Sequence, residues 1–401
     1  MSFQSLAILC LLAVVEAGAQ PIIRGRAAAA TLAIEHANVL PIDRDTVLLD
    51  HTVLITGDRI SWIGPSSSAP IESGTERVDA QGAFLIPGLA DMHVHLEDSA
   101  DLPLYVAEGV TTVRNMRGGP RYLAMRERVA QGTLLGPTIF TSGPTLLGGR
   151  RSSAEFVTLR APEDAERVVL EQARAGYDMI KVHSELEIPV YDRILATARR
   201  AGIPVVGHRI AEPGLSRSLR AGQVSFEHAD RSLFGDRGAD MDERATEIAR
   251  AGAWVGTLIE TRNRPGALRT SINELRGLAT PRCFGPGDGS RDVIPALRRA
   301  NVRLLAGTDA SLAPMRPGTA LHCELAALVT VGLTPYEALT TATRNAGEFA
   351  RLHLKHEVPF GTVTVGSRAD LVLLRRNPAA DISALQTPIG TVLRGRWHPA
   401  R

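Results

Sequence analysis

The sequence predicts an α/β fold, in which a (β/α)8 TIM barrel carries a small β-sandwich domain. Short strand patterns alternate with helix patterns through the middle of the chain, and both chain ends contain short β-branched segments. In addition, several apolar runs end in a side chain that can bind a metal. Strand–helix repetition is typical of a parallel sheet, and eight units suit a closed barrel whose active site lies at the C-terminal ends of the strands.

The N-terminus has the pattern of an export signal. Residues 6–15 form an apolar run too short to span a bilayer, and Ala17-Gly18-Ala19 supplies small residues for cleavage. We therefore expect residues 1–19 to be a signal peptide of a periplasmic or secreted protein with no membrane segment in its mature form. No Lys or Arg precedes the apolar run, so an uncleaved start is the alternative.

The two chain ends are predicted to pair. Neither end alone has enough strands to bury one face, so we expect a composite β-sandwich from residues 20–86 and 355–401. The break Thr56-Gly57-Asp58-Arg59 indicates a hairpin. The expected strands are 32–34, 52–55, 60–63, 361–366, 369–374 and 390–395.

Residues 87–354 are predicted to form the barrel. The expected strands are 84–92, 110–115, 137–142, 178–182, 203–207, 223–227, 253–259 and 302–308. The clearest helix patterns are 162–176, 190–201 and 242–251, each closing near a Gly. Long loops at 143–162 and 260–290 would lie over the active-site end. A doubly wound open sheet is the alternative fold, but no Gly-x-Gly-x-x-Gly follows the first strand.

Composition narrows the range of partners. The formal net charge is +2 and no Lys/Arg-rich block is present, so we expect a small-molecule substrate and no nucleic acid. A homo-oligomer is possible, and the sequence does not fix the oligomeric state. Beyond the predicted signal the cysteines are Cys283 and Cys323, which could pair in an oxidising compartment, although the sequence does not decide this.

The candidate metal ligands begin with His93 and His95. Residues i and i+2 of a strand face the same side, so both imidazoles could reach one point. Two surface histidines on an edge strand are the alternative, but the apolar run that ends in Pro87-Gly88 argues against it. Lys181 follows Met179-Ile180 in a strand that looks buried. It is either a salt-bridged barrel lysine or, when deprotonated, an amine able to take up carbon dioxide.

The remaining candidates end other strands. His208 and His228 follow predicted strands, and Asp309 follows Gly307-Thr308. Separately, each histidine could be a hydrogen-bonded core or rim residue, and the aspartate could be an N-cap. Together, however, the six side chains occupy the C-terminal ends of five strands, and independent accident would scatter them. Neutral imidazole and carboxylate are common ligands of Zn²⁺ and similar ions.

These residues resemble the amidohydrolase superfamily, most closely its imidazolonepropionase-like and Xaa-Pro dipeptidase-like members. The similar stretches are 57–64, 87–95, 109–114, 180–181, 226–228, 307–309, 332–339 and 366–371. The resemblance implies a distorted barrel, a sandwich built from both chain ends, and two divalent metal ions, expected to be zinc. It implies that His93 and His95 hold one ion with Asp309, that His208 and His228 hold the second, and that a Lys181 carbamate formed with carbon dioxide bridges them.

The expected reaction is hydrolysis of an amide-type C–N bond in a dipeptide or N-acyl amino acid, with Asp309 as general base and acid. Arg150 and Arg209 fall in predicted strand-end loops, where a guanidinium could bind a terminal carboxylate, and His183 would share the strand face of Lys181. The chain differs from the family pattern mainly in these loops. A cyclic-amide hydrolase, a lactonase and a catalytically inactive scaffold are the alternatives, and the presence of all six ligands disfavours the scaffold.

Overall fold

In this computed structural model the chain is described over residues 29–150, 153–183, 185–211, 214–235, 240–260, 283, 285–310 and 316–400. The predicted signal peptide lies outside these residues, as does most of the 260–290 loop.

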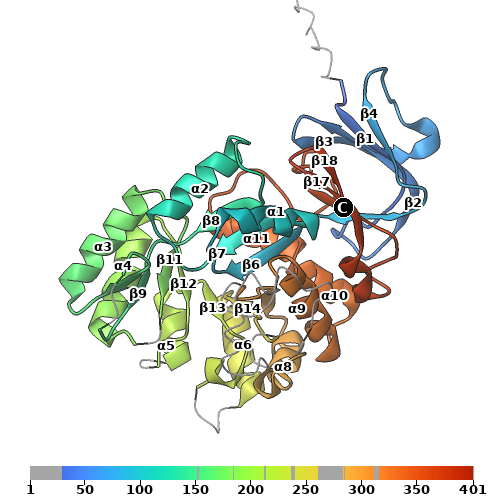
Figure 1. The fold of residues 1–401 in the computed structure, drawn as a ribbon. Coiled ribbons are helices and arrows are strands. Elements are labelled where there is room, and N and C mark those ends of the chain that lie inside the picture. The colour runs from blue at the N-terminus through green and yellow to red at the C-terminus, as the bar shows by residue number, and fades with distance from the viewer. Residues whose placement is uncertain are drawn as a thin grey trace, which may run out of the picture.

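Strands from both chain ends pair in one sheet. Figure 1 shows the N-terminal strands beside the red C-terminal strands. Among the described residues this sheet has eight strands in the order β18-β17-β16-β5-β1-β2-β3, with β4 paired to β1. They are β1 (Leu32–Val39), β2 (Leu48–Thr56), β3 (Arg59–Pro65), β4 (Glu76–Asp79), β5 (Phe84–Pro87), β16 (Leu371–Leu374), β17 (Pro388–Leu393) and β18 (Arg396–Pro399). The β5–β16 pair joins the two ends, and strands from both contribute to one apolar core, so the two chain ends share one β domain.

A ring of parallel strands forms the barrel. Within the described residues these strands are β6 (Leu89–Val94), β7 (Val110–Asn115), β8 (Thr138–Thr141), β11 (Ile180–Val182), β12 (Val205–Gly207), β13 (Ser225–Glu227), β14 (Trp254–Gly256) and β15 (Arg303–Leu305). They lie in two sheets, β6-β7-β8 and a second one from β11 to β15. Parallel bridges Ser142–Met179 and Val94–Ala310 connect the two sheets and close the ring.

Helices surround the barrel on its outside (Figure 1). They are α1 (Leu102–Ala107), α2 (Pro120–Ala130), α3 (Pro162–Arg174), α4 (Ile188–Ala201), α5 (Gly214–Ala221), α6 (Met241–Ala251), α8 (Val293–Arg299), α9 (Thr319–Thr330), α10 (Pro335–Thr341) and α11 (Arg344–His353). The residues predicted to begin and end helices do so. Pro162 is the first residue of α3, and Gly202 and Gly252 follow α4 and α6 in the left-handed conformation. Within the described residues no helix combines the length and apolar character that a membrane crossing requires.

Three sequence predictions about strands were wrong. The segment 84–92 is two strands, because β5 joins the terminal sheet and β6 joins the barrel. They separate at Gly88, where a Cβ would lie 2.3 Å from Thr111 Oγ1, so the backbone can approach the next strand only without a side chain. Residues 361–366 form turns instead of a strand. The 143–162 loop contains two short strands, β9 (Thr145–Leu147) and β10 (Phe156–Thr158), which extend the sheet beyond β11.

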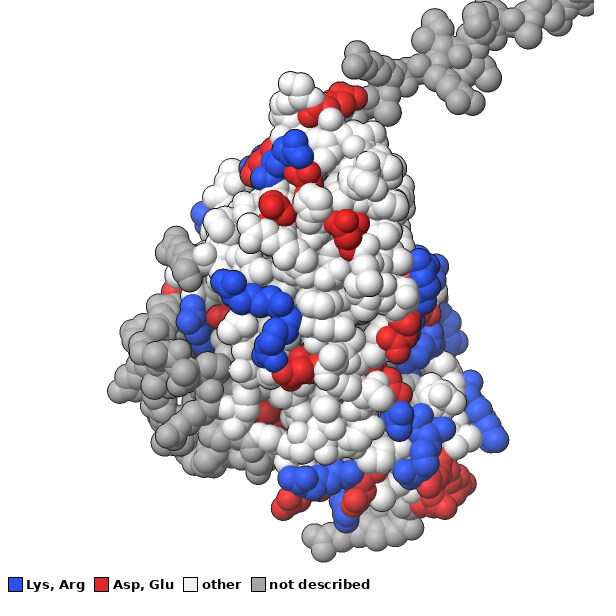
Figure 2. Space-filling view, turned by 90° about the vertical axis from the view of Figure 1, so that its right-hand side faces the viewer, with Lys and Arg blue, Asp and Glu red and all other residues white. Residues whose placement is uncertain are grey.

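Apolar residues fill the barrel interior. Met92, Val206 and Trp254 of three barrel strands, together with Met179 just before β11, share a buried cluster with Phe349 of α11. The Trp254 and Phe349 rings meet edge to face, with centroids 5.5 Å apart. On the surface, acidic and basic side chains are interspersed on the face shown in Figure 2, in agreement with the near-neutral net charge.

A disulfide joins Cys283 to Cys323 of α9, across 40 residues of sequence. The sequence left this pairing open. Such a bridge stabilises a fold chiefly by restricting the unfolded chain.

We predict that the double variant Cys283→Ser/Cys323→Ser unfolds with a free energy lower by roughly 2–4 kcal/mol, the usual cost of losing a native disulfide. Urea denaturation of oxidised wild type, reduced wild type and the double variant measures this. Reduction should lower the stability of wild type and leave the double variant unchanged. Equal stability of the three samples would contradict the disulfide.

Candidate active site

The six predicted ligands lie at the C-terminal ends of barrel strands. His93 and Lys181 lie within their strands, and the others follow theirs. The strands and residues are β6 with His93 and His95, β11 with Lys181, β12 with His208, β13 with His228 and β15 with Asp309.

Three of these side chains form a compact cluster. One ligand atom each from His93, His95 and Asp309 lies within 4.8 Å of the others, and all three residues are buried. His95 Nε2 is 2.8 Å from Asp309 Oδ1, and His93 Nε2 is 3.5 Å from the same oxygen. Burial lowers the pKa of both histidines, which keeps the imidazoles neutral and their ring lone pairs available. The cluster therefore offers two neutral nitrogens and one carboxylate at a single point.

Lys181 points into this cluster. Its Nζ lies 3.4 Å from His93 Nε2, and the side chain is buried. Burial disfavours the ammonium form and lowers the pKa of Lys181 to about 8. About a tenth of this amine is therefore uncharged at pH 7, far more than for a lysine of ordinary pKa.

His208 and His228 form a second group beside the first. Their ring centroids are 4.9 Å apart, and the His228 ring is 5.5 Å from that of His93. His183 lies next to His208, with ring centroids 4.2 Å apart. The two predicted ligand groups are therefore in contact through the His93 and His228 rings, and His183 adjoins His208.

Unusual backbone conformations place two of these side chains. His228 has φ = 69° and Asp309 has φ = 57°, in the left-handed region that residues other than glycine seldom occupy. Such residues cost free energy and persist where the surrounding structure holds them, commonly at functional sites. The amides of Thr308 and Asp309 donate to the His93 carbonyl at 3.1 and 2.8 Å, so the turn is fixed against β6.

Three further buried charged residues surround the ligands, and the sequence did not single them out. Glu227 lies 2.9 Å from His93 Nδ1 and pairs with Arg114. Burial opposes the Glu227 charge, but Arg114 and His93 outweigh it and hold the pKa of this carboxyl below its ordinary range. Asp91 accepts from the Thr308 hydroxyl at 2.7 Å, and burial raises its pKa to about 7. The sequence feature that could have identified these residues is a charged side chain within a strand that is otherwise mostly uncharged.

The two predicted substrate arginines differ in their surroundings. Arg150 is exposed in the connection between β9 and β10. Arg209 directly follows His208, but its guanidinium donates to backbone carbonyls of Ser232, Ile210 and Ala211. Arg209 therefore ties the segment after β12 to the one after β13.

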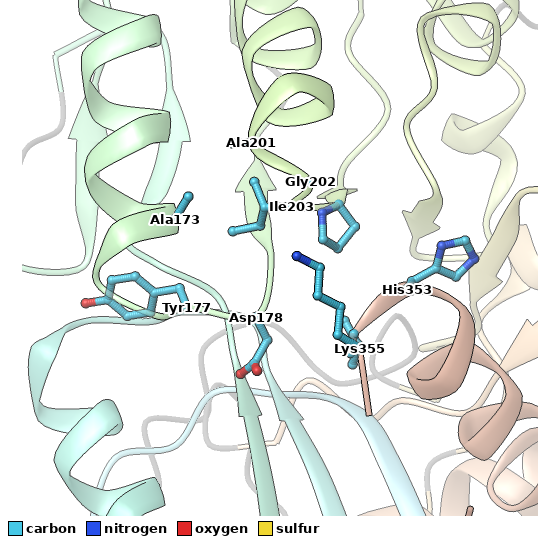
Figure 3. A pocket seen from close by; sticks show the side chains of 10 residues that line it. Ala173, Tyr177, Asp178, Ala201, Gly202, Ile203, His353 and Lys355 are labelled. Carbon is cyan, nitrogen blue, oxygen red and sulfur yellow. The ribbon is translucent and has the colours of Figure 1, made fainter. Parts of the chain in front are cut away.

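A hollow of about 220 Å³ lies at the opposite end of the barrel (Figure 3). Its lining includes Asp178, which precedes β11, and Ile203, which precedes β12, whereas the candidate ligands lie at the other ends of these strands. Lys355 extends toward Gly202 at the C-terminus of α4, where the helix dipole favours a cation. This hollow is not the candidate active site.

The donor set suits a divalent cation. Asp309 Oδ1 approaches both imidazoles, yet among the described residues it accepts no hydrogen bond of acceptable geometry. Two imidazole nitrogens and a carboxylate with open positions beyond them are typical of catalytic sites for zinc and similar metals.

The comparisons with known proteins agree on one family. The model of the amidohydrolase family matches residues 84–398. An adenine deaminase from Deinococcus radiodurans is 28% identical over 358 residues, and the match covers 84% of this chain and 57% of that protein. This chain therefore spans little more than half the length of that relative. An imidazolonepropionase from an Arthrobacter species is 27% identical over 385 residues, covering 84% of this chain and 90% of that protein.

Solved structures share the fold. The structure of a Xaa-Pro dipeptidase with methionine bound in its active site superposes with a TM-score of 0.74 and 21% identity, covering 92% of this chain and 99% of that one. Molinate hydrolase superposes with a TM-score of 0.75 and 20% identity, covering 92% and 95%. At these identities the likeness concerns the fold, and it agrees with the predicted barrel and sandwich.

We predict that His95→Ala weakens binding of a divalent cation at this cluster, probed with Zn²⁺, by at least about 100-fold, because one of three converging ligand atoms is lost. Competition with a chromophoric zinc chelator measures the affinity. His398→Ala in β18, within the terminal sheet, is the control and should bind as wild type does. Equal affinity of His95→Ala and His398→Ala would exclude this cluster as the metal site.

Proposed function

The chain belongs to the amidohydrolase family, and from this we propose that it is a two-metal hydrolase that cleaves the amide bond of a dipeptide or an N-acyl amino acid. The observation that carries the proposal is the convergence of His93, His95 and Asp309 on one buried point beside Lys181.

In this proposal, His93 and His95 bind one divalent ion together with Asp309, and His208 and His228 bind the other. Zinc suits these ligands, since imidazole and carboxylate both bind it well. Lys181 would join the two sites after its neutral amine takes up carbon dioxide, because the resulting carbamate offers two anionic oxygens. The position of Nζ beside His93 and the lowered pKa of Lys181 support this assignment.

Two bound ions would supply Lewis acidity, lowering the pKa of a shared water from 15.7 toward about 7 and polarising the substrate carbonyl. Asp309 then serves as the proton carrier. Although burial opposes its charge, the neighbouring histidines hold the pKa of Asp309 well below its ordinary value, so the carboxylate is ionised and can accept the proton of the attacking water. It returns that proton to the leaving nitrogen, because an amine leaves poorly unless it is protonated.

For the substrate, we propose that Arg150 binds the terminal carboxylate and that Arg209 and His183 belong to the same substrate site. A guanidinium can hold a carboxylate through two parallel hydrogen bonds. Arg150 is exposed, whereas Arg209 already donates to three backbone carbonyls, so Arg150 is the better candidate. The fold shared with a Xaa-Pro dipeptidase is compatible with such a substrate.

Hydrolysis of a cyclic amide is the second candidate, because the imidazolonepropionase relative matches over 90% of its own length. The same site chemistry would also open a lactone. We further propose that the protein is exported, and the Cys283–Cys323 disulfide supports this because disulfides persist in oxidising compartments.

We predict that Lys181→Met binds fewer than two equivalents of Zn²⁺ and does not respond to bicarbonate. In wild type, the neutral amine fraction rises about tenfold per pH unit below the lowered pKa of about 8. At fixed carbon dioxide pressure, metal reconstitution should therefore accelerate between pH 6 and pH 7. Metal analysis after gel filtration measures both effects. Two equivalents bound by Lys181→Met would contradict the bridging role.

We predict that the zinc-loaded protein hydrolyses dipeptides or N-acyl amino acids with a kcat/KM at least about 100-fold above that for cyclic ureides and lactones. A panel of the four substrate classes tests this. Faster turnover of a cyclic ureide would establish the second candidate instead.

We predict that Arg150→Ala raises KM for carboxylate-bearing substrates by about 10-fold, the usual effect of losing a charge-assisted hydrogen bond. A neutral amide analogue should show no change. Arg396→Ala, an exposed arginine of β18, is the matched control. An equal loss on acidic and neutral substrates would remove Arg150 from the carboxylate site.

A further inference from the structure

The Glu227–Arg114 ion pair contacts His93 at Nδ1, the ring nitrogen that faces away from the other ligands. Glu227 is the last residue of β13, and its carboxylate is fully buried. It lies 2.9 Å from His93 Nδ1, and it accepts from Arg114 Nη2 at 2.9 Å and from Ser225 Oγ at 2.8 Å. We propose that Glu227, held by Arg114, is a positioning residue that fixes the tautomer and ring orientation of His93 and thereby sets the metal affinity of the site. The part concerning metal affinity rests on the proposed function.

The hydrogen-bond partners determine which nitrogen of His93 carries the proton. A carboxylate paired with a guanidinium offers only acceptors, so the hydrogen in its contact with His93 belongs to Nδ1. The lone pair is then on Nε2, which faces Asp309 Oδ1 at 3.5 Å and Lys181 Nζ at 3.4 Å. The opposite tautomer would direct an N–H at the point where the metal ligands meet.

Arg114 holds the carboxylate in place across the barrel. Its side chain is fully buried, and it donates to the Met92 carbonyl of β6, to Ser225 Oγ and to both carboxylate oxygens of Glu227. Its guanidinium also packs over the Phe349 ring at 4.9 Å. Arg114 belongs to β7, whereas Glu227 belongs to β13, which is not an adjacent strand. The guanidinium therefore compensates the buried charge of Glu227 and links β7 to β13, two strands that are not hydrogen-bonded to each other.

Glycines leave room for this arrangement. A Cβ at Gly256 of β14 would lie 2.2 Å from Glu227 Oε2, the oxygen that faces His93. A Cβ at Gly307 would lie 2.6 Å from His93 Cβ. Any side chain at either position would push one partner of the His93–Glu227 pair away from the other.

A purely structural ion pair would predict a different set of effects. It would stabilise the barrel without favouring one His93 tautomer, and its loss would change the unfolding free energy but not the metal affinity of correctly folded protein. A positioning role predicts changes in both tautomer and affinity. Loss of such outer partners typically weakens metal binding by about 10–100-fold.

The test compares Glu227→Gln with Glu324→Gln. Glu324 is an equally buried glutamate that accepts from the Thr257 hydroxyl and from the Ile259 and Glu260 amides. Among the described residues, none of these hydrogen bonds joins it to a proposed metal ligand. Zn²⁺ affinity is measured by chelator competition, and ¹⁵N NMR of the histidine rings in metal-free protein reports the tautomer. Circular dichroism establishes folding.

We expect the His93 ring in wild type to carry its proton on Nδ1. Glu227→Gln should lose this preference and bind Zn²⁺ about 10–100-fold more weakly, whereas Glu324→Gln should bind within about twofold of wild type. Folded Glu227→Gln with wild-type affinity, or a wild-type His93 protonated on Nε2, would overturn the inference.

A second variant and a measurement on metal-free protein cover the cases in which Glu227→Gln does not fold or wild type binds no metal. If Glu227→Gln does not fold, Gly256→Ala displaces the same carboxylate oxygen and should show the same loss of affinity and tautomer preference. If wild type binds no metal, the proposed function fails, while the tautomer measurement on metal-free protein still decides whether Glu227 positions His93.

Discussion

The site depends on the contact between the first and last barrel strands. The ring closes where Val94 bridges to Ala310, and next to this bridge the His93 carbonyl accepts from the amides of Thr308 and Asp309. The Asp91 carboxylate strengthens the contact by accepting from the Thr308 hydroxyl, 217 positions away in sequence. This contact between the first and last strands brings the imidazoles of β6 and the carboxylate after β15 close together.

The buried acidic residues behind the ligands have hydrogen-bond or ion-pair partners. Arg114 compensates Glu227, and Asp91 is held by a hydroxyl and by backbone amides. Removing one member of a buried pair leaves an uncompensated charge, which is costly. The ligand cluster therefore lies in a low-dielectric setting with a defined hydrogen-bond network around it. This setting also explains why Lys181 loses its proton more readily than an exposed lysine.

Sequence patterns predicted those features that depend only on residues close together in the chain. The alternation of His93, Val94 and His95 on an apolar strand predicted two imidazoles on one face, and turn glycines such as Gly202 predicted where helices end. The split of 84–92 into two strands escaped prediction because it depends on the approach of Gly88 to Thr111, a contact between strands. Glu227 and Arg114 were not paired in advance, since they come from strands that are not neighbours and periodicity says nothing about contacts across a barrel.

The proposed metal site is one buried point that the first and last barrel strands make together. Anomalous diffraction at the zinc absorption edge, from crystals grown with Zn²⁺ and bicarbonate, tests it most directly. We expect two peaks at the C-terminal ends of the strands, one bound by His93, His95 and Asp309 and the other by His208 and His228, with continuous density from Lys181 to both. Zinc bound elsewhere, with these side chains empty, would contradict the account.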